Sequence, residues 1–228
     1  MLSVVIPTLN EEKNIPLIIR ELNKVKVRKE IIFVDDNSSD NTKKVIKNFL
    51  NKKIKLINRK NLSRDLSKSV LMGINKAKFN YVMVIDCDLQ HNISIVDKMF
   101  KKLILNNYDI VIGSRFKKKK ISGNLGILRS LFSLLFIFII NFILKKKTSD
   151  PLSGFFICNK SLVQNFKNNF FNNGYKIMFD IIYNGKQDIK IKDFQIEFKK
   201  RLHGKSKLGY KIVITFIKQF LYTAMRKF

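Results

Sequence analysis

Apolar residues in the first half of the chain follow two alternating patterns. Short runs that are apolar throughout, such as residues 81–85, predict strands covered on both faces of a sheet. Between these runs, apolar residues recur at steps of three and four, as at Ile15, Ile18, Ile19 and Leu22, which predicts helices with one buried face. The predicted strands are 2–7, 30–34, 54–57, 81–85 and 110–112. The predicted helices are 11–25, 39–50, 65–77 and 93–105.

Strands that alternate with helices predict an α/β fold, because a helical crossover is the usual connection between parallel strands of one sheet. We therefore expect a mostly parallel, twisted sheet flanked by helices. In such sheets, ligands bind beyond the carboxyl ends of the strands. The residues that directly follow each strand are therefore the first candidates for chemistry.

After residue 113 the pattern changes, and its main feature is an apolar run at 131–144. As a helix this run would extend about 21 Å, short of the roughly 30 Å hydrocarbon core of a bilayer. A buried core helix is one interpretation. A helix lying in the membrane interface is the other, because Arg129 and the lysines at 145–147 would suit anionic headgroups. A membrane-spanning helix is the least favoured interpretation.

The rest of the second half carries weaker signals and one clear helical pattern. Residues 155–158 and 194–198 predict strands, 179–183 predicts part of a helix, and the basic segment 117–120 predicts a loop. Residues 208–228 predict a C-terminal amphipathic helix. Its polar positions fall on one face at steps of three and four, and include Lys211, Thr215, Lys218, Gln219 and Arg226.

Length and composition bound the class of protein. The 228 residues are 46% hydrophobic and 27% charged, which excludes a disordered or fibrous chain. No linker-like segment divides the sequence, so we expect a single domain over 1–228, with the apolar helix at about 127–144. Two cysteines, Cys87 and Cys158, exclude a disulfide scaffold. The net charge of +28 favours polyanionic partners: nucleic acid, anionic lipid or phosphorylated substrates.

Acidic and amide residues gather where the predicted strands end. Of only 17 acidic residues, six lie at these ends, at positions 11, 12, 35, 36, 86 and 88. Carboxylates packed together repel one another unless a cation joins them. Oxygen ligands of this kind suit Mg²⁺ or Mn²⁺, which keep coordination positions open for substrate phosphates. The sequence has no His/Cys cluster with zinc spacing.

Each of these residues also has an ordinary structural interpretation. A lone D-x-D triplet occurs often by chance. Asp35 and Asp36 could serve a turn or cap a helix, and Cys87 could be a small buried side chain. The combination favours a site, because two acidic strand ends, 50 residues apart, lie on strand–helix crossovers of one predicted sheet.

Six segments together resemble family 2 glycosyltransferases with the GT-A fold. They are VVIPTLNEEKNI, IIFVDDNSSDNT, RDLSKSVLMGINKAKFNYVMVIDCDLQH, IVIGSRF, SDPLSGFF and RLHGKSK. The D-x-D-L-Q-H form and the later Gly-Ser-Arg are much more specific than D-x-D alone. The similarity is greatest to the dolichol-phosphate (polyprenol-phosphate) mannosyltransferase group, and it covers about residues 2–210.

The resemblance implies roles for the residues that match these motifs. The nucleotide sugar would be held by Pro7, Thr8, Asn10, Glu11, Val34, Asp36, Asp86, Cys87, Arg201 and Lys207. The metal would be held by Asp86, Asp88 and Gln90, and the acceptor phosphate by Arg115, Arg129 and Ser133. The residues expected to carry catalysis are Asp88, Arg115 and Arg129. His91 matches a histidine of the family to which no chemistry is assigned.

The resemblance also implies an activity: an inverting glycosyltransferase that uses Mg²⁺ or Mn²⁺ and moves a hexose to a polyprenyl or dolichyl phosphate. Mannose from GDP-mannose is the leading donor, and a UDP-sugar is the alternative. Because the acceptor lies in a membrane, we expect a peripheral protein on the cytoplasmic face, either free or with a separate membrane-anchoring subunit. No nucleic-acid partner is expected.

Elementary chemistry agrees with these roles. A lipid phosphate is largely ionised at neutral pH, since its second pKa lies near 6, so its attack needs no strong general base. Arginine binds phosphate oxygens bidentately, and Arg115, Arg129 and Arg201 are three of only eight arginines in a lysine-rich chain. The alternative is that these arginines pair with acidic side chains of the protein.

Two other functions stay open from the sequence. A family 2 enzyme that glycosylates a hydroxyl on a polysaccharide or lipid needs a carboxylate base, and Asp150 is the only acid between Asp109 and Asp180. A basic nucleic-acid-binding protein would also account for the charge. The sequence has no RNA- or DNA-binding motif, however, and the acids at the strand ends disfavour that function.

Overall fold

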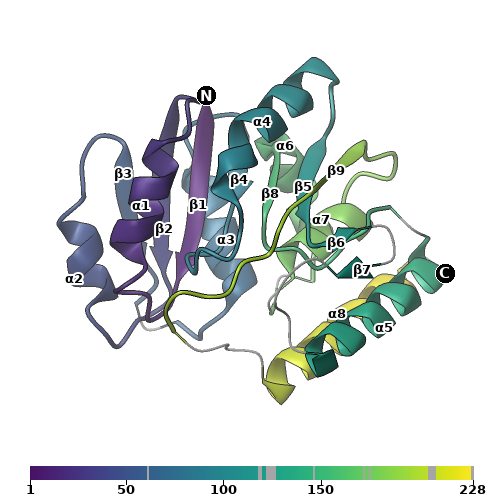
Figure 1. Cartoon of the computed structure of the whole chain (residues 1–228). Helices are drawn as coiled ribbons and strands as arrows, with labels where there is room; N and C mark the ends of the chain where they lie inside the picture. The colour runs from purple at the N-terminus through teal and green to yellow at the C-terminus, as the bar shows by residue number, and fades with distance from the viewer. Residues whose placement is uncertain are drawn as a thin grey trace.

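A computed structural model of the chain describes residues 1–60, 62–117, 120–121, 127–145, 147–171, 173–174, 176–204 and 209–226, with no side chains described at 117, 120–121 and 127–134. Strands and helices alternate through the first half, as predicted (Figure 1). The strands are β1 (Leu2–Thr8), β2 (Lys29–Asp35), β3 (Ile54–Asn58), β4 (Tyr81–Val84), β5 (Ile110–Ser114), β6 (Phe116–Lys117), β7 (Lys120–Ile121), β8 (Phe156–Asn159) and β9 (Ile191–Gln195). The helices are α1 (Ile15–Asn23), α2 (Thr42–Lys47), α3 (Leu66–Lys76), α4 (Val96–Leu105), α5 (Ile127–Leu144), α6 (Lys160–Gln164), α7 (Ile177–Tyr183) and α8 (Tyr210–Met225).

Within the described residues, seven strands form one sheet in the order β3-β2-β1-β4-β8-β5-β9. All neighbouring pairs are parallel except those made by β8, which runs antiparallel to both β4 and β5. The prediction of a mostly parallel sheet is therefore confirmed. In register, Thr8 of β1 lies opposite Asp35 of β2, and Val5 lies opposite Val84 of β4. The carboxyl ends of these three strands therefore meet at one edge, the lower edge of the sheet in Figure 1.

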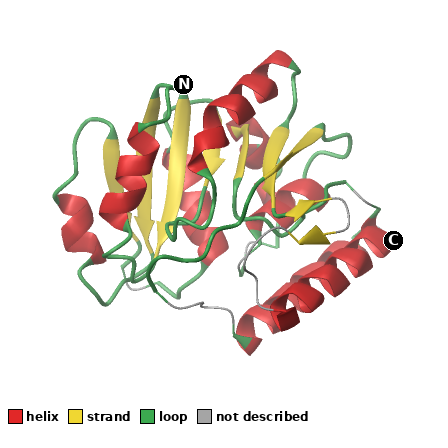
Figure 2. Cartoon of the chain, in the orientation of Figure 1, coloured by secondary structure: helices red, strands yellow, loops and turns green. Residues whose placement is uncertain are grey.

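Helices cover both faces of the sheet (Figure 2). Each covered face has its own hydrophobic core. One core joins the sheet to α1, α2 and α4, through side chains such as Ile18, Ile46 and Phe100. The other joins it to α3, α6 and α7, and to α5 and α8, through Ile74, Ile140 and Phe216. Strands buried on both faces explain why β1, β4 and β5 are apolar along nearly their whole length.

Some boundaries differ from the sequence prediction for identifiable reasons. The helix predicted at 11–25 begins only at Ile15, with Pro16 in its first turn, where a missing N–H breaks no helical hydrogen bond. The strand predicted at 194–198 lies earlier, as β9, because it pairs with β5 from Ile110–Ile191 to Ser114–Gln195. At the ends of the loop predicted at 117–120, Lys117 of β6 pairs with Lys120 of β7, and residues 118–119 lie outside the described structure.

Helices α5 and α8 lie side by side at the lower right of Figure 1. They meet through Phe136 and Phe216, whose rings are 5.4 Å apart and edge to face. The inner face of α5 packs into the core through Ile137, Ile140 and Leu144. Its outer face exposes Phe138 and Phe142 to solvent, by 68% and 81%. One face of α5 therefore belongs to the core, as the first interpretation of the apolar run predicts, and its contact with a membrane interface stays a prediction.

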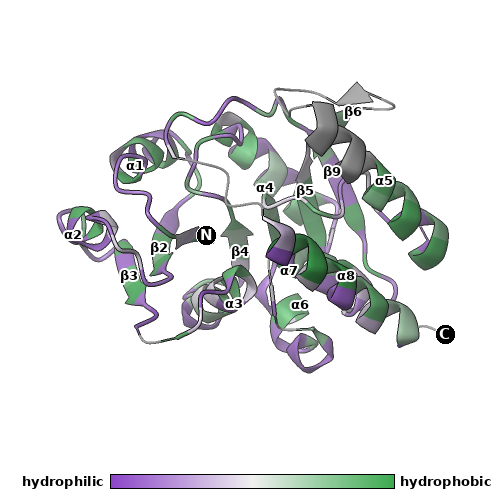
Figure 3. Cartoon of the chain, turned by 90° about the horizontal axis from the view of Figure 1, so that it is seen from below, coloured by the Kyte–Doolittle hydropathy of each residue, from purple (hydrophilic) through white to green (hydrophobic). Residues whose placement is uncertain are grey.

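Helix α8 turns only part of its predicted polar face to solvent, namely Lys211, Lys218 and Arg226. Gln219 and Thr223 are buried, and Gln219 Nε2 donates a hydrogen bond to Asp180 Oδ2 over 2.8 Å. Asn184 donates to both Thr223 Oγ1 and Asp180 Oδ1. The residues left exposed are mostly apolar: Tyr210, Val213, Ile214, Ile217, Leu221 and Met225. Figure 3 shows the hydrophobic colour over much of both α5 and α8.

None of the described helices combines the length and the apolar character that a membrane crossing requires.

Candidate functional site

Three tight turns follow β1, β2 and β4, and each contains a residue in the left-handed backbone conformation. These residues are Asn10, Asn37 and Leu89, with φ of 53°, 61° and 59°. Asparagine tolerates this conformation well, whereas leucine adopts it at a cost of roughly 1–2 kcal/mol. The turns reverse the chain just beyond the strand ends, and that reversal places polar side chains over the edge of the sheet. Strain of this kind is common at functional sites.

A cavity of about 180 Å³, open to solvent, lies at this edge. Eight of the residues predicted for the site line it: Pro7, Thr8, Glu11, Asp36, Asp86, Cys87, Asp88 and Arg201. Residues that the sequence prediction missed complete the lining: Leu9, Arg64, Asp65, Leu66 and Ser69. The fold therefore brings together segments that lie far apart in the chain, as the strand-end argument predicts.

Asp86 is the more accessible of the two aspartates of the D-x-D motif. Its side chain is 40% exposed, and its Oδ2 lies 3.3 Å from Nε2 of His91, which is 2% exposed. Burial acts to raise the pKa of Asp86, but the hydrogen bond and charge of His91, with the charges of Lys176 and Arg115, lower it overall. Asp86 is therefore a carboxylate that keeps its negative charge and faces the cavity.

Asp88 is less exposed, at 8% for its side chain, and is bound from two sides. Arg201 Nη2 lies 2.8 Å from its Oδ2, and the backbone N–H of Gln90 donates to its Oδ1 over 3.2 Å. Burial, followed by the neighbouring charge of Asp86, raises the pKa of Asp88, although Arg201 opposes the rise. A cation shared between the two carboxylates would relieve this repulsion.

The two aspartates fit a hard divalent cation by the chemistry of their donor atoms. Among the described residues, no group of three or more His, Cys, Asp or Glu side chains forms a complete metal-binding set. Mg²⁺ is commonly held by one or two protein carboxylates together with water and substrate phosphates. Gln90, the predicted third ligand, uses its side chain differently: Nε2 donates to the Lys199 carbonyl, and Oε1 lies 3.4 Å from Arg201.

Asp36 lies on the opposite wall and is held by a buried arginine that the sequence prediction did not include. Arg59 forms an ion pair with Asp36, and its Nη1 also donates to the Asp65 carbonyl and to Ser69 Oγ, both over 3.0 Å. The N–H of Asp65 donates to Asp36 Oδ2 over 2.7 Å. Burial nevertheless raises the pKa of Asp36. This cluster ties the end of β2 to the start of α3.

Other predicted residues lie near the cavity without lining it. Asn10 braces two turns, because its Oδ1 accepts from the Ser39 N–H over 2.9 Å. Val34 is fully buried in the core, and its carbonyl accepts from Thr8 Oγ1. Asp35 stabilises a turn, as its structural interpretation predicts, because its Oδ2 accepts a hydrogen bond from the Ser38 N–H over 3.0 Å.

Arg115 makes a buried, bidentate ion pair with Asp150. Its Nε and Nη2 each lie 2.8 Å from a different Asp150 oxygen, and its backbone N–H donates to the same carboxylate. The guanidinium also stacks near the rings of Phe116 and Phe198. Arg115 therefore pairs with an acidic side chain of the protein, which is the alternative to phosphate binding that the sequence left open for the arginines. This pairing places Arg115 outside the cavity lining, and the predicted contact with an acceptor phosphate stays a prediction.

Three predicted residues fall partly or wholly outside the described structure. Lys207 lies outside the described residues. Arg129 and Ser133 lie on α5, but their side chains are not described. Their predicted contacts with the donor diphosphate and the acceptor phosphate therefore stay predictions.

The site residues that the sequence prediction missed differ in whether a local sequence signal marks them. Asp65 is the N-cap of α3, with its Oδ1 accepting from the Lys68 N–H over 2.9 Å, and an acidic residue before an apolar helix is a recognised start signal. Arg59, Arg64 and Ser69 carry no such local signal. Their place depends on how the β3–α3 connection folds back over the end of β2.

Comparisons with known proteins identify the fold and the family of this chain. The structure aligns with that of glucosyl-3-phosphoglycerate synthase from Mycobacterium tuberculosis with a TM-score of 0.75, at 17% identity over 98% of this chain and 80% of that one. At that identity the likeness concerns the fold alone, which is the GT-A fold of nucleotide-sugar-dependent transferases. A sequence profile of glycosyl transferase family 2 matches residues 3–166. The chain belongs to glycosyl transferase family 2.

Two curated relatives carry the same name, dolichol-phosphate mannosyltransferase. The protein from Pyrococcus furiosus is 31% identical over 98% of this chain, and the chain spans only 63% of that relative's length. The protein from Saccharomyces cerevisiae is 29% identical over 95% of this chain and 84% of its own length. Other structures of the mycobacterial synthase contain Mn²⁺ with UDP or UDP-glucose.

Proposed function

We propose that this protein transfers a hexose from a sugar nucleotide to a polyprenyl phosphate at a membrane surface, with GDP-mannose as the leading donor. The observation that carries the proposal is the single cavity in which Asp36, Asp86, Asp88 and Arg201 meet at the carboxyl edge of the sheet. The names of the two curated relatives support mannose and a dolichyl phosphate.

The two walls of the cavity suggest how the donor lies. Asp36, with Asp65 and Ser69 behind it, offers acceptor and hydroxyl groups that suit the hydroxyls and edges of a nucleoside. Asp86 and Asp88 lie on the other wall, beside the cation of Arg201. The diphosphate therefore belongs between these aspartates and Arg201, with the nucleoside toward Asp36.

Asp86 and Asp88 would hold a divalent metal together with the diphosphate, and Mn²⁺ in the mycobacterial structures supports this assignment. When bound, the metal supplies positive charge that stabilises the nucleoside diphosphate as a leaving group. Arg201 adds a planar donor group for the same phosphate oxygens.

The transfer itself balances without a general base. An oxygen of the lipid phosphate attacks the anomeric carbon of the sugar, the bond from that carbon to the diphosphate oxygen breaks, and the nucleoside diphosphate leaves. No proton has to be removed, because the attacking oxygen is already ionised near neutral pH. Attack from the side opposite the leaving group inverts the anomeric configuration. Arg129 and Ser133, with Arg115, are the residues proposed for the acceptor phosphate.

The exposed faces of α5 and α8 supply the proposed contact with the membrane. The exposed residues of both helices are mostly apolar and include Phe138, Phe142, Ile217 and Leu221. Amphipathic helices of this kind lie in the interface with their apolar side toward the acyl chains. The net charge of +28 adds attraction to anionic lipids. The cytoplasmic face is proposed because sugar nucleotides occur there.

The structure gives no support to a hydroxyl acceptor activated by Asp150. That carboxylate is fully buried, and both of its oxygens are bound by Arg115. A general base must come within hydrogen-bond reach of the proton that it removes. Among the two acceptor classes, the ionised lipid phosphate therefore fits the site better.

The test is a transfer assay with a panel of labelled sugar nucleotides, polyprenyl phosphate and either Mg²⁺ or Mn²⁺. We expect label to move from GDP-mannose into an organic-soluble product, and Asp88→Ala to abolish that product. Asp188→Ala is the matched control, because Asp188 is an exposed aspartate on the turn after α7. Absence of any lipid-linked product with every donor would reject the proposal. Equal turnover by the Asp88→Ala protein would reject the assignment of the metal site.

A further inference from the structure

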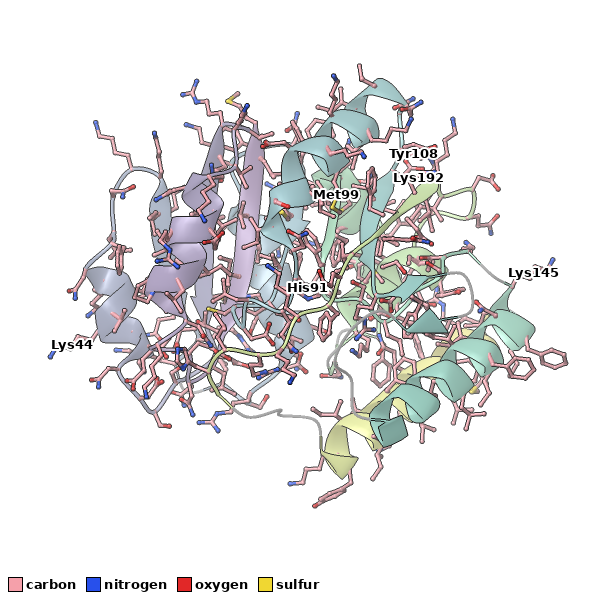
Figure 4. The ribbon with its side chains drawn as sticks, in the orientation of Figure 1. Lys44, His91, Met99, Tyr108, Lys145 and Lys192 are labelled. Carbon is pink, nitrogen blue, oxygen red and sulfur yellow. The ribbon has the colours of Figure 1, made fainter. Side chains whose placement is uncertain are left out.

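His91 is a buried polar side chain that packs between two aromatic rings and hydrogen-bonds to Asp86. Its imidazole is 2% exposed and lies between the rings of Phe155 and Phe198, each with its centroid 5.3 Å away. It is labelled near the centre of Figure 4, among side chains of the interior. Burial of a polar ring costs free energy unless a hydrogen bond compensates it. The bond that compensates it joins Nε2 to Asp86.

The direction of that hydrogen bond follows from the acceptor. An ionised carboxylate only accepts, so Nε2 carries the hydrogen and donates it to Asp86 Oδ2. His91 Nδ1 is buried with no hydrogen-bond partner among the described residues. The contact with Asp86 therefore places the hydrogen that His91 donates on Nε2.

A second contact restricts the same carboxylate from another side. A Cβ added at Gly154 would lie 2.6 Å from Asp86 Oδ2 and 3.2 Å from Oδ1, so the backbone of residue 154 packs directly against this group. His91 and Gly154 together leave Asp86 little freedom to rotate. The exposed part of the carboxylate can then face only the cavity.

We propose that His91 is a positioning residue, which holds Asp86 in the orientation that binds the metal–diphosphate group. The inference rests on the proposed function, because it needs the metal site at Asp86 and Asp88. Residues that hydrogen-bond to metal ligands orient them, and their loss typically lowers metal affinity about 10- to 100-fold. His91 would act in this way through Asp86 and without touching the substrate.

The experiment compares two amide variants that differ in reach. The side chain of His91→Gln can place an N–H donor where Nε2 lies, whereas that of His91→Asn is one methylene shorter and falls short of Asp86. Mn²⁺ binding is measured by electron paramagnetic resonance in the presence of GDP or UDP, whichever the wild-type protein binds. We expect His91→Asn to weaken Mn²⁺ binding about 10- to 100-fold, and His91→Gln to restore most of it. Asn106→Ala, at an exposed residue that directly follows α4 and does not line the cavity, is the control and should bind like wild type.

The possible outcomes separate this inference from the proposed function. Failure of the wild-type protein to bind Mn²⁺ with either nucleotide would reject the proposed metal site, and the inference with it. Normal wild-type binding with equal binding by His91→Asn would overturn the positioning role alone. Equal losses in both amide variants would assign the effect to ring packing and overturn the donor role. If His91→Asn does not fold, His91→Phe decides in its place: it keeps a ring between the phenylalanines and removes the donor, so wild-type affinity would overturn the role and a loss would support it.

Discussion

The exposed face of α5 allows a quantitative test of the membrane contact. Phe138 and Phe142 lie one helical turn apart, with stacked rings 6.3 Å between centroids, and are 68% and 81% exposed. Removing one phenylalanine side chain fully from water is worth about 1.5–3 kcal/mol. Scaled by their exposure, the pair offers about 2–4 kcal/mol on transfer to lipid. At 1.4 kcal/mol per factor of ten, this is about a 30- to 1,000-fold effect on binding to vesicles.

The perturbation is the double variant Phe138→Ser/Phe142→Ser, which removes apolar surface without adding charge. The matched control is Ile104→Ser/Leu105→Ser, because both residues are exposed on α4, and Leu105 by 70%. Binding is measured by sedimentation with vesicles of phosphatidylcholine and phosphatidylserine, in low and high salt. We expect the α5 variant to lose affinity by the stated factor, the α4 variant to bind like wild type, and salt to weaken all three proteins. Wild-type binding by the α5 variant would refute the proposed contact surface.

Three further changes test the site and its support. Glu30 accepts hydrogen bonds from Lys55, Ser3 and the residue 78 N–H, which lower its pKa despite burial. Glu30→Gln should therefore destabilise the fold at pH 7, and the gap in unfolding free energy should close as the pH falls below about 4.3. Arg115→Ala should lower the unfolding free energy by about 3–5 kcal/mol in denaturant titration, because it leaves the Asp150 carboxylate buried without its ion-pair partner. Gly154→Ala should weaken Mn²⁺ binding by displacing the Asp86 carboxylate while the melting temperature changes little.

Because Arg115→Ala is expected to destabilise the fold, a loss of lipid transfer in that variant would combine a folding defect with any defect in acceptor binding. Arg115→Lys keeps a cation beside Asp150 and removes the planar bidentate group, so it separates the two. Donor binding should survive in it, and a higher KM for the lipid would support the proposed acceptor contact.

The sequence was sufficient to predict the edge of the sheet that carries the cavity. Each strand is marked by a local apolar run, and parallel strands bring their carboxyl ends to one edge whatever the packing of the helices. Asp36, Asp86 and Asp88 therefore came together as predicted. The start of α1 was predicted too early, because the apolar period extends beyond the turn before Pro16.

The partners of the charged residues could not be predicted, because they come from distant segments. Arg201 meets Asp88 only because residues 199–201 run beside Gln90, and Arg59 meets Asp36 only through the fold of the β3–α3 connection. The orientation of α8 is another example. The hydropathy pattern predicted which residues of α8 are polar. It did not predict that Gln219 is buried, because its hydrogen-bond partner Asp180 lies on a distant segment, α7.

The most direct test compares two acceptors that differ only in the phosphate: polyprenyl phosphate and the matching polyprenol. The wild-type protein is incubated with the sugar nucleotide that it binds and a divalent metal, and labelled lipid is measured in the organic phase. We expect product from the phosphate, none from the alcohol, and loss of product on chelation. Equal transfer to the alcohol, or full transfer to the phosphate after chelation, would contradict this expectation.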